Sequence, residues 1–376
     1  MKIVFTGGGT GGHFYPMIAV IQKVNSLIDK NNIVGAKLYY FSDSPYDKAV
    51  LMENSVLFEQ VSAGKMRLYF SFKNFIDMFK VVGGIIGAIF KLYSIYPDVV
   101  FSKGGYAAFP TLVAARILRI PVVMHESDST PGRVNKWTGK FAKKIAVSFK
   151  EAGEYFPKGR VAWTGHPLRM EIENKMERNK ALDFFKLESN LPVVLILGGS
   201  QGAELINQTI LDTLPELVNK FQVIHQTGVS NYKSLLGRSG VVLGDNLNKS
   251  RYLPMPFLNN LAMKNAAGAA DLIVSRAGST IFEIAAWGVP SIIIPITNSN
   301  DDHQRKNAYN YAHTGACIVI EEANMTSHIL YSEIDRIIEN KVVSEKMKNA
   351  TSIFGKKNSA EMIAEEIIKI ALSHEK

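Results

Sequence analysis

The run Lys2-Ile3-Val4-Phe5-Thr6-Gly7-Gly8-Gly9-Thr10-Gly11-Gly12-His13 decides the fold of this chain. A short apolar segment ends in glycines and leads into a helical pattern, which predicts a strand, a tight turn and a helix. Such a turn presents backbone N–H groups and the positive end of a helix at one point. Glycine allows a ligand to come close to the backbone because no Cβ stands in the way. We therefore expect an anion site here, of a size that suits a diphosphate.

Two familiar phosphate motifs share this glycine spacing. A Walker loop requires lysine where His13 stands and serine or threonine where Phe14 stands, so that motif is excluded. A dinucleotide site fits Gly7, Gly9 and Gly12, but it requires an acid about 20 residues further on. Asp43 follows the second expected strand and lies further away than that rule expects. A nicotinamide-dependent (NAD) oxidoreductase therefore remains an alternative, and so does a non-catalytic nucleotide-binding membrane protein.

The same pattern begins again in the second half of the chain, where Val193–Leu197 leads into Gly198-Gly199-Ser200-Gln201-Gly202-Ala203 and a helix. Short apolar runs alternate with longer helical patterns in both halves, which predicts α/β units with parallel sheets. We expect strands at Lys2–Thr6, Lys37–Phe41, Val99–Ser102, Val122–His125, Lys144–Ser148, Pro192–Leu197, Gln222–Gln226, Leu272–Ser275, Ser291–Pro295 and Ala316–Ile320.

A length of 376 residues suits two domains, because single cores rarely grow beyond about 300 residues. We expect two Rossmann-like domains, residues 1–163 and 164–354, whose parallel sheets face each other across a cleft. Residues 355–376 are expected to form a C-terminal helix that packs back on the first domain. Asn358 and Glu361 resemble a capping box at the start of that helix.

Composition sets wider limits. Hydrophobic residues make up 47% and charged residues 20% of the chain, as in ordinary globular proteins. The only cysteine, Cys317, rules out an internal disulfide. The formal charge of +9 favours an anionic partner, which could be a phosphorylated substrate, a nucleic acid or an anionic membrane surface.

His13 is the candidate catalytic residue. It follows the glycine turn near the expected start of a helix, where the positive end of the helix dipole disfavours protonation of the ring. A neutral imidazole beside a bound diphosphate is suited to act as a general base. A histidine that only hydrogen-bonds the turn or a phosphate is the alternative.

Several blocks of the chain, taken together and in order, resemble the MurG family of glycosyltransferases. The blocks are Gly7-Gly8-Gly9-Thr10-Gly11-Gly12-His13, His125-Glu126-Ser127-Asp128, Pro131-Gly132, Asn135-Lys136, Thr164-Gly165-His166-Pro167-Leu168-Arg169, Gly198-Gly199-Ser200-Gln201-Gly202-Ala203, Ser275-Arg276-Ala277-Gly278, Glu283, Asp302-His303-Gln304 and Asn307-Ala308. The resemblance implies a GT-B fold and an inverting transfer of N-acetylglucosamine (GlcNAc) from UDP-GlcNAc. The implied acceptor is the C4 hydroxyl of undecaprenyl-diphospho-MurNAc-pentapeptide (lipid I), which gives lipid II for peptidoglycan synthesis. Another UDP-sugar transferase of the same fold, with a lipid acceptor, is the nearest alternative.

The resemblance also implies roles for single residues. Those matched to UDP-GlcNAc binding are Thr10, Gly11, Gly12, Arg169, Ser200, Leu258 (beside the uracil), Glu283 (on the ribose hydroxyls) and Gln304 (on the GlcNAc hydroxyls). Those matched to the acceptor or to secondary contacts are His125, Glu126, Asp128 and His303. Asp128 departs from the asparagine that many family members carry, and the interval from Gly278 to Glu283 is one residue short. Structural roles remain the alternatives: core packing for Leu258, helix-dipole stabilisation for Glu283, and a buried pair for His125 and Glu126.

The resemblance implies neither a cofactor nor a nucleic-acid partner, and no spaced D-x-D metal motif stands near the donor residues. Asp301-Asp302 is adjacent rather than spaced, which is typical of a solvated turn. A helix dipole and backbone N–H groups could stabilise the departing UDP without a metal in the site.

A lipid acceptor directs attention to an aromatic stripe at helical spacing, formed by Phe72, Phe75, Phe79, Val82, Ile86, Ile89 and Tyr93. Basic residues surround it: Lys65, Arg67, Lys73, Lys80 and Lys91. An apolar face with basic flanks can lie in an anionic headgroup layer, although most such stripes belong to a core. We expect a peripheral protein on the cytoplasmic face of the cell membrane.

Overall fold

The structure is a computed structural model that describes residues 1–8, 10–64, 72–199, 202–297, 299, 302–356 and 358–374. It divides into two compact units. Unit 1 comprises Met1–Arg169 together with Lys357–Lys376, and unit 2 comprises Met170–Lys356. The chain therefore passes from unit 1 to unit 2 a few residues after the boundary expected at 163. The C-terminal helix belongs to unit 1.

Unit 1 contains a seven-stranded sheet in the order β3-β2-β1-β4-β5-β6-β7, and every described pairing in it is parallel. The strands are β1 (Lys2–Gly7), β2 (Lys37–Ser42), β3 (Val56–Gln60), β4 (Val99–Gly104), β5 (Val122–Glu126), β6 (Lys144–Val147) and β7 (Val161–Trp163). Successive residues Ile3, Val4 and Phe5 are all fully buried, so both faces of the central strand are covered.

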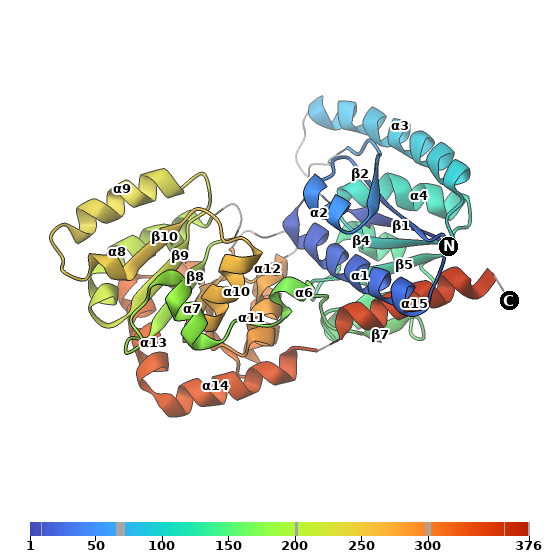
Figure 1. Cartoon of the computed structure of the whole chain (residues 1–376). Helices are drawn as coiled ribbons and strands as arrows, with labels where there is room; N and C mark the ends of the chain where they lie inside the picture. The colour runs from blue at the N-terminus through green and yellow to red at the C-terminus, as the bar shows by residue number, and fades with distance from the viewer. Residues whose placement is uncertain are drawn as a thin grey trace. The chain divides into compact units, whose positions relative to one another are not determined.

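Helices of unit 1 pack around this sheet (Figure 1). They are α1 (Gly11–Lys30), α2 (Lys48–Glu53), α3 (Phe72–Ile95), η1 (Tyr106–Ala108), α4 (Phe109–Ile117), α5 (Arg133–Thr138), η2 (Glu151–Tyr155), α15 (Ser359–Ala371) and η6 (Leu372–His374). Helix α3 packs on α4. Helix α15 packs against α1 and over β4, and its residues Ile363, Ala364 and Ile367 enter the same core as Ile3 and Phe5. The last helix of the chain thus completes the core of the first unit.

Unit 2 contains a six-stranded sheet in the order β10-β9-β8-β11-β12-β13, again with parallel pairings only among the described strands. The strands are β8 (Val193–Leu197), β9 (Gln222–Gln226), β10 (Tyr252–Met255), β11 (Leu272–Ser275), β12 (Ser291–Ile293) and β13 (Cys317–Val319). The strand order repeats that of unit 1, with the first strand of each unit in the middle of its sheet. In unit 2 the chain adds β9 and β10 on one side of β8, and then adds β11, β12 and β13 on the other side. This is the Rossmann-like arrangement, so the predicted class of two α/β domains with parallel sheets is confirmed.

Helices cover the sheet of unit 2 on both faces. They are α6 (Met170–Glu173), α7 (Arg178–Phe185), α8 (Glu204–Lys220), α9 (Tyr232–Leu243), η3 (Lys249–Arg251), α10 (Asn260–Ala269), α11 (Thr280–Trp287), α12 (His303–Ala312), η5 (Glu322–Asn324), α13 (Ser327–Glu339) and α14 (Lys341–Phe354). Ile206, Ile210 and Leu214 of α8 pack with Leu330 and Ile334 of α13 over the sheet.

All ten strands expected from the sequence are present, and the sequence pattern missed β3, β7 and β10. Each of these three is an edge strand of its sheet. Edge strands are buried on fewer sides, and β7 has only half-buried and exposed residues. They therefore lack the continuous apolar run that marks the central strands.

The predicted capping box at the C-terminal helix is wrong. Asn358 has φ 72°, in the left-handed region, and its side chain makes no capping hydrogen bond. Ser359 instead donates its hydroxyl to the carbonyl oxygen of Gly165 at 2.8 Å, which ties the start of α15 to the loop after β7.

Helix α3 presents most of its apolar stripe to solvent. Phe79 is 60% and Tyr93 is 71% exposed, and Val82 and Ile86 are also exposed. Phe90, which was not in the predicted stripe, is 70% exposed. The opposite face is buried at Gly84, Ala88 and Leu92 and packs on α4. Core packing is therefore the wrong explanation for the stripe among the side chains that the structure describes, which exclude those of Phe72 and Phe75.

A buried histidine makes the stability of unit 2 sensitive to acid. His225 on β9 is fully buried between the Tyr252 hydroxyl and the Asn207 side chain, each at 3.0 Å. Burial lowers the pKa of His225 to about 3. The unfolded chain keeps an ordinary pKa and takes up the proton first, so stability is lost as the pH falls below about 6.5.

We predict that unit 2 loses roughly 2 kcal/mol more of its unfolding free energy between pH 7.5 and pH 5 in the wild type than in His225→Gln, because 1.36 kcal/mol corresponds to one pKa unit. Urea unfolding reported by Trp287, with Trp137 and Trp163 replaced by phenylalanine, would measure this difference. Equal losses in the two proteins would contradict the assignment of a neutral buried ring.

Candidate functional site

The candidate catalytic histidine lies at the carboxyl edge of the unit 1 sheet, where β1 ends and α1 begins. His13 is in the first turn of α1, and its Nδ1 lies 2.9 Å from the Thr10 hydroxyl. Thr10 occupies the N-cap position of α1, yet its side chain makes no capping bond to the backbone. If Nδ1 carries the ring proton and donates it to Thr10, then Nε2 keeps its lone pair to accept a proton.

Two glycines allow the backbone to close around this histidine. Gly105 has φ 81° and ψ 166°, and a Cβ there would lie 3.1 Å from the Gly8 carbonyl oxygen and 3.6 Å from His13 Nε2. Gly8 has φ 142°, and a Cβ there would lie 2.6 Å from the Ser42 hydroxyl. Strands β1, β2 and β4 thus converge at this point, which is the topological switch point of the sheet, where open α/β sheets bind ligands.

A polar network lies at the ends of the neighbouring strands β4 and β5. Lys103 on β4 is 1% exposed, and its Nζ contacts His125 Nδ1 at 2.7 Å and the Ser127 hydroxyl. The other nitrogen of His125 lies 3.1 Å from the Gly165 carbonyl oxygen and 3.2 Å from the Ser148 hydroxyl. The network therefore joins the ends of three strands and the loop after β7.

Glu126 organises the loop that follows β5. Its carboxylate accepts hydrogen bonds from the backbone N–H of Asp128 at 2.9 Å, that of Gly132 at 3.2 Å, and the Asn135 amide at 2.8 Å. Both His125 and Glu126 are buried, so the predicted pair is brought together with Asp128 by contacts within unit 1.

Burial shifts the pKa of each ionisable group in this network. It lowers the pKa of Lys103 to about 8, although the carboxylates of Glu126 and Asp128 act in the opposite direction. It raises the pKa of Glu126 to about 7, an effect that Asp128 strengthens. Burial and the Lys103 charge hold the pKa of His125 well below its ordinary value, so this ring is neutral. Ionisable groups with shifted pKa values that gather at the carboxyl edge of a parallel sheet are typical of a functional site.

Arg169 also lies on unit 1, close to the start of α1. Its guanidinium carbon is 4.0 Å from the centre of the Tyr15 ring, two residues after His13. Arg169 is the last residue of the unit before the chain crosses to unit 2. A cation stacked on an aromatic ring keeps its planar donors directed sideways, where they can reach an anionic ligand.

The remaining predicted residues lie on unit 2, near the carboxyl edge of its sheet. Glu283 is in the first turn of α11, which begins three residues before it at Thr280. Gln304 of α12 accepts a hydrogen bond from the Ile296 N–H at 3.2 Å through its side-chain oxygen. Leu258 is 3% exposed and offers little surface for a ligand. His303 is the first residue of α12.

Ser200 falls outside the described residues, as do Gly9 and Asp301. Among the residues that the structure does describe, no group of three histidine, cysteine or acidic side chains is placed to hold a metal ion.

Two functional candidates were missed by sequence reasoning. Lys103 ends an apolar strand directly before Gly104-Gly105, and a charge at that point was a visible signal. Arg276 was noted only within a motif. It forms a 2.6 Å ion pair with Glu322 at the end of β11, and its Nε is buried without a partner in the described structure. Thr297 donates both its N–H and its hydroxyl to Glu322, at 2.8 and 2.7 Å, which fixes the loop after β12.

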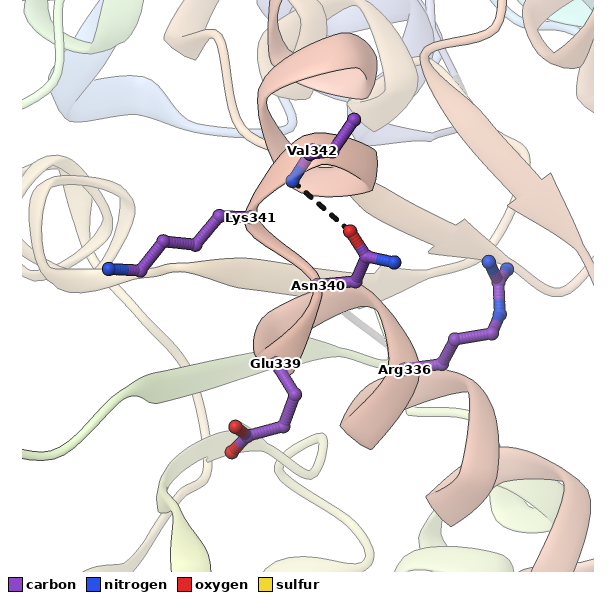
Figure 2. A pocket seen from close by; sticks show the side chains of 5 residues that line it. All are labelled: Arg336, Glu339, Asn340, Lys341 and Val342. Carbon is purple, nitrogen blue, oxygen red and sulfur yellow. Dashed lines mark hydrogen bonds between the residues drawn. The ribbon is translucent and has the colours of Figure 1, made fainter.

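A surface hollow at the junction of α13 and α14 is not a second site. Its lining consists of Arg336, Glu339, Asn340, Lys341 and Val342. The Asn340 side chain accepts hydrogen bonds from the N–H groups of Val342 and Val343 at 3.1 and 3.2 Å, so it caps α14 (Figure 2). The charged side chains point away from one another rather than toward a common centre, as Figure 2 shows.

Comparison with known proteins decides the family. Models of the glycosyltransferase family 28 N-terminal and C-terminal domains match residues 3–147 and 193–367. The chain is 34% identical over 369 residues to the UDP-N-acetylglucosamine--N-acetylmuramyl-(pentapeptide) pyrophosphoryl-undecaprenol N-acetylglucosamine transferase 2 of Bacillus anthracis, covering 97% of this chain and 99% of the relative. This chain belongs to the MurG family.

Solved structures agree on the fold of this MurG family member. MurG from Acinetobacter baumannii is similar with a TM-score of 0.73 at 24% identity, covering 98% of this chain and 99% of that one. UDP-GlcNAc 2-epimerase from Neisseria meningitidis, bound to UDP-GlcNAc, is similar with a TM-score of 0.67 at 16% identity, covering 98% and 100%. The expected GT-B fold is confirmed. Because an epimerase shares it, the family rests on the full-length identity rather than on the fold.

The oxidoreductase alternative has no support in these comparisons. Asp43, the acid it required, accepts a hydrogen bond from the Tyr106 hydroxyl at 2.9 Å and another from Ser42 at 3.2 Å. It supports the glycine-rich turn before α4 in this structure.

The glycine requirement at position 105 can be tested by stability. We predict that Gly105→Ala lowers the unfolding free energy by roughly 1–3 kcal/mol, because an alanine is strained at these dihedral angles. Gly87→Ala in α3 is the matched control: a Cβ there meets no atom within 4 Å. In a helix interior that change should be neutral or add up to about 1 kcal/mol. Urea unfolding that shows no difference between the two variants would contradict the strained turn.

Proposed function

We propose that this chain is an inverting N-acetylglucosaminyltransferase that moves GlcNAc from UDP-GlcNAc to the C4 hydroxyl of lipid I and so forms lipid II for peptidoglycan synthesis. The observation that carries the proposal is the 34% identity over 97% of the chain to a transferase named for this reaction. The geometry on unit 1 supports the proposal, because His13, whose Nδ1 contacts the Thr10 hydroxyl, lies at the carboxyl edge of the sheet.

In the proposed mechanism, His13 Nε2 removes the proton from the C4 hydroxyl of the acceptor. The C4 oxygen forms a bond to the anomeric carbon of GlcNAc as the bond from that carbon to the diphosphate oxygen breaks. The electron pair leaves with UDP, and the proton passes from His13 to solvent. Attack from the side opposite the leaving group inverts the anomeric centre. General-base assistance of this kind contributes about 10²–10⁴-fold to rate.

The other predicted residues bind substrates in this proposal. Glu283 holds the ribose hydroxyls, the backbone at Leu258 lies beside the uracil, and the Gln304 amide reads the GlcNAc hydroxyls together with His303. Thr10, Gly11 and Gly12 of the loop, with Ser200 and Arg169, contact the sugar diphosphate of UDP-GlcNAc. Backbone N–H groups and helix ends stabilise the charge that develops on UDP.

The acceptor side falls to residues of unit 1. His125 and Glu126 end β5 and Asp128 lies in the loop that follows, at the same sheet edge as His13. We assign the acceptor and the membrane-facing role to unit 1, and the nucleotide to unit 2.

We further propose that the protein works at the cytoplasmic face of the cell membrane as a peripheral protein, with α3 as its docking surface. Among the described residues, Asp77–Ile95 is long and apolar enough to cross a bilayer, by length and composition alone. Only 17% of its most apolar window is buried, yet one face packs on α4. A helix already covered on one face suits the plane of the interface better than a span.

The basic flanks of this helix are described only in part. Lys80 is exposed and lies 3.7 Å from Asp77, and Lys91 pairs with Glu59. Lys65, Arg67 and the Lys73 side chain fall outside the described residues. The formal charge of +9 favours an anionic leaflet over a neutral one.

The role of His13 is tested by turnover. With UDP-GlcNAc and a lipid I analogue, we expect His13→Ala to lower kcat by about 10²–10⁴-fold, the contribution of a general base. His328→Ala, an exposed histidine on α13, is the matched control and should keep wild-type turnover. Near-normal turnover of His13→Ala would remove it from the base role. Efficient transfer from UDP-glucose but not from UDP-GlcNAc would favour the second candidate, a transferase for another UDP-sugar.

The docking surface is tested by vesicle sedimentation. Phe79→Ser with Phe90→Ser removes two exposed rings, each worth roughly 1.5–3 kcal/mol when buried. We therefore expect binding to phosphatidylglycerol vesicles to fall by more than about tenfold. Val34→Ser is the control, since Val34 is 92% exposed and lies away from α3 in the chain. Binding unchanged by the paired serines would refute α3 as the docking surface.

A further inference from the structure

The buried lysine at the end of β4 has no part in the mechanism described above. Lys103 is 1% exposed, so its ammonium group does not reach a substrate directly. A lone buried charge is costly, and buried charges in proteins are paired or hydrogen-bonded. The hydrogen-bond partners and neighbouring charges of Lys103 therefore indicate the role of its ammonium group.

The hydrogen-bond partners of Lys103 fix the state of its neighbours. An ammonium group can only donate, so His125 Nδ1, at 2.7 Å, must accept. The ring proton of His125 then sits on Nε2, which donates toward the Gly165 carbonyl oxygen at 3.1 Å. Lys103 also donates to the Ser127 hydroxyl. One cation thus holds the end of β5 and the first residue of the loop that follows it.

Two carboxylates act electrostatically on the same cation. Glu126 is 3% exposed and Asp128 is half-buried, and both act electrostatically on Lys103. The Asp128 N–H donates to Glu126 Oε1 at 2.9 Å, which brings these two acids close together. The charge of Asp128 disfavours a second negative charge on Glu126, whereas Lys103 favours it. Without the lysine, the buried Glu126 would face the negative charge of Asp128 without the positive charge that now opposes it.

We propose that Lys103 is a positioning residue for the acceptor: it fixes Ser127 and balances the charges of Glu126 and Asp128, so that the loop after β5 keeps one conformation. This inference rests on the proposed function, in which that loop belongs to the acceptor side of the site. Lys103 acts through Ser127 and Asp128 and touches no reacting atom.

A double-mutant cycle tests charge balance directly. The variants are Lys103→Met, Asp128→Asn and the pair together, with Lys140→Met, an exposed lysine of the same unit, as the control. kcat/KM is measured for a lipid I analogue, and KM is measured separately for UDP-GlcNAc. We expect Lys103→Met to lower kcat/KM for the acceptor by about tenfold or more, the usual size of coupling between residues in one network. KM for UDP-GlcNAc should change by less than about threefold, because the donor is held mainly by unit 2.

The pair is the decisive variant. Removing both charges relieves the repulsion between Glu126 and Asp128, but it does not restore the hydrogen bonds from Lys103 to His125 and Ser127. We therefore expect kcat/KM of the pair to lie at least about threefold above the value that the two single losses multiplied together would give. Losses that simply multiply, or a Lys103→Met enzyme with wild-type kcat/KM, would overturn the proposal.

Folding and function can be separated in this experiment. Circular dichroism and urea unfolding of all variants show whether Lys103→Met still folds. If it does not, the proposal predicts that the pair folds and turns over, and a pair that also fails to fold refutes it. A wild-type enzyme with no GlcNAc transfer would count against the proposed function, whereas an active wild type with no rescue in the pair counts only against the role of Lys103.

Discussion

Every described strand pairing in both units is parallel, and the arrangement of the candidate site depends on this one constraint. Parallel strands place all their carboxyl ends along one edge, so turns far apart in sequence meet there. In unit 1 the ends of β1, β4 and β5 bring together His13, Lys103 and the His125–Asp128 segment. In unit 2 the same rule places Arg276 and the loop after β12 at one edge, where Glu322 joins them.

Dense packing on both faces of each sheet leaves this edge as the place where polar groups gather. The central strands are buried throughout, and their side chains are almost entirely apolar until the last residues. At those last residues a lysine, a histidine and a glutamate are buried: Lys103 contacts His125, and Glu126 accepts hydrogen bonds from the loop that follows β5. Such a cluster is held by hydrogen bonds and opposite charges rather than by apolar contact, so it is sensitive to the loss of any single partner.

The sequence allowed much of the fold to be predicted, because central strands and glycine turns leave strong local patterns. The edge strands β3, β7 and β10 were missed because partial burial weakens that pattern. At the site, His13 and Glu126 could be singled out from motifs, but the role of Lys103 could not. Its importance depends on the register of β4 beside β5, which pairs Ser102 with Met124 and so brings Lys103 to His125. The start of α15 could not be predicted either, because Ser359 bonds to Gly165, which lies 194 residues earlier in the chain.

The central claim is that this edge supports one direct displacement at the anomeric carbon of UDP-GlcNAc by an acceptor hydroxyl. The most direct test is the anomeric configuration of the product formed from α-linked UDP-GlcNAc and a lipid I analogue, read from the proton coupling at C1 by nuclear magnetic resonance. A single displacement assisted by His13 predicts a β-linked disaccharide. An α-linked product, or release of free GlcNAc without transfer, would contradict the account.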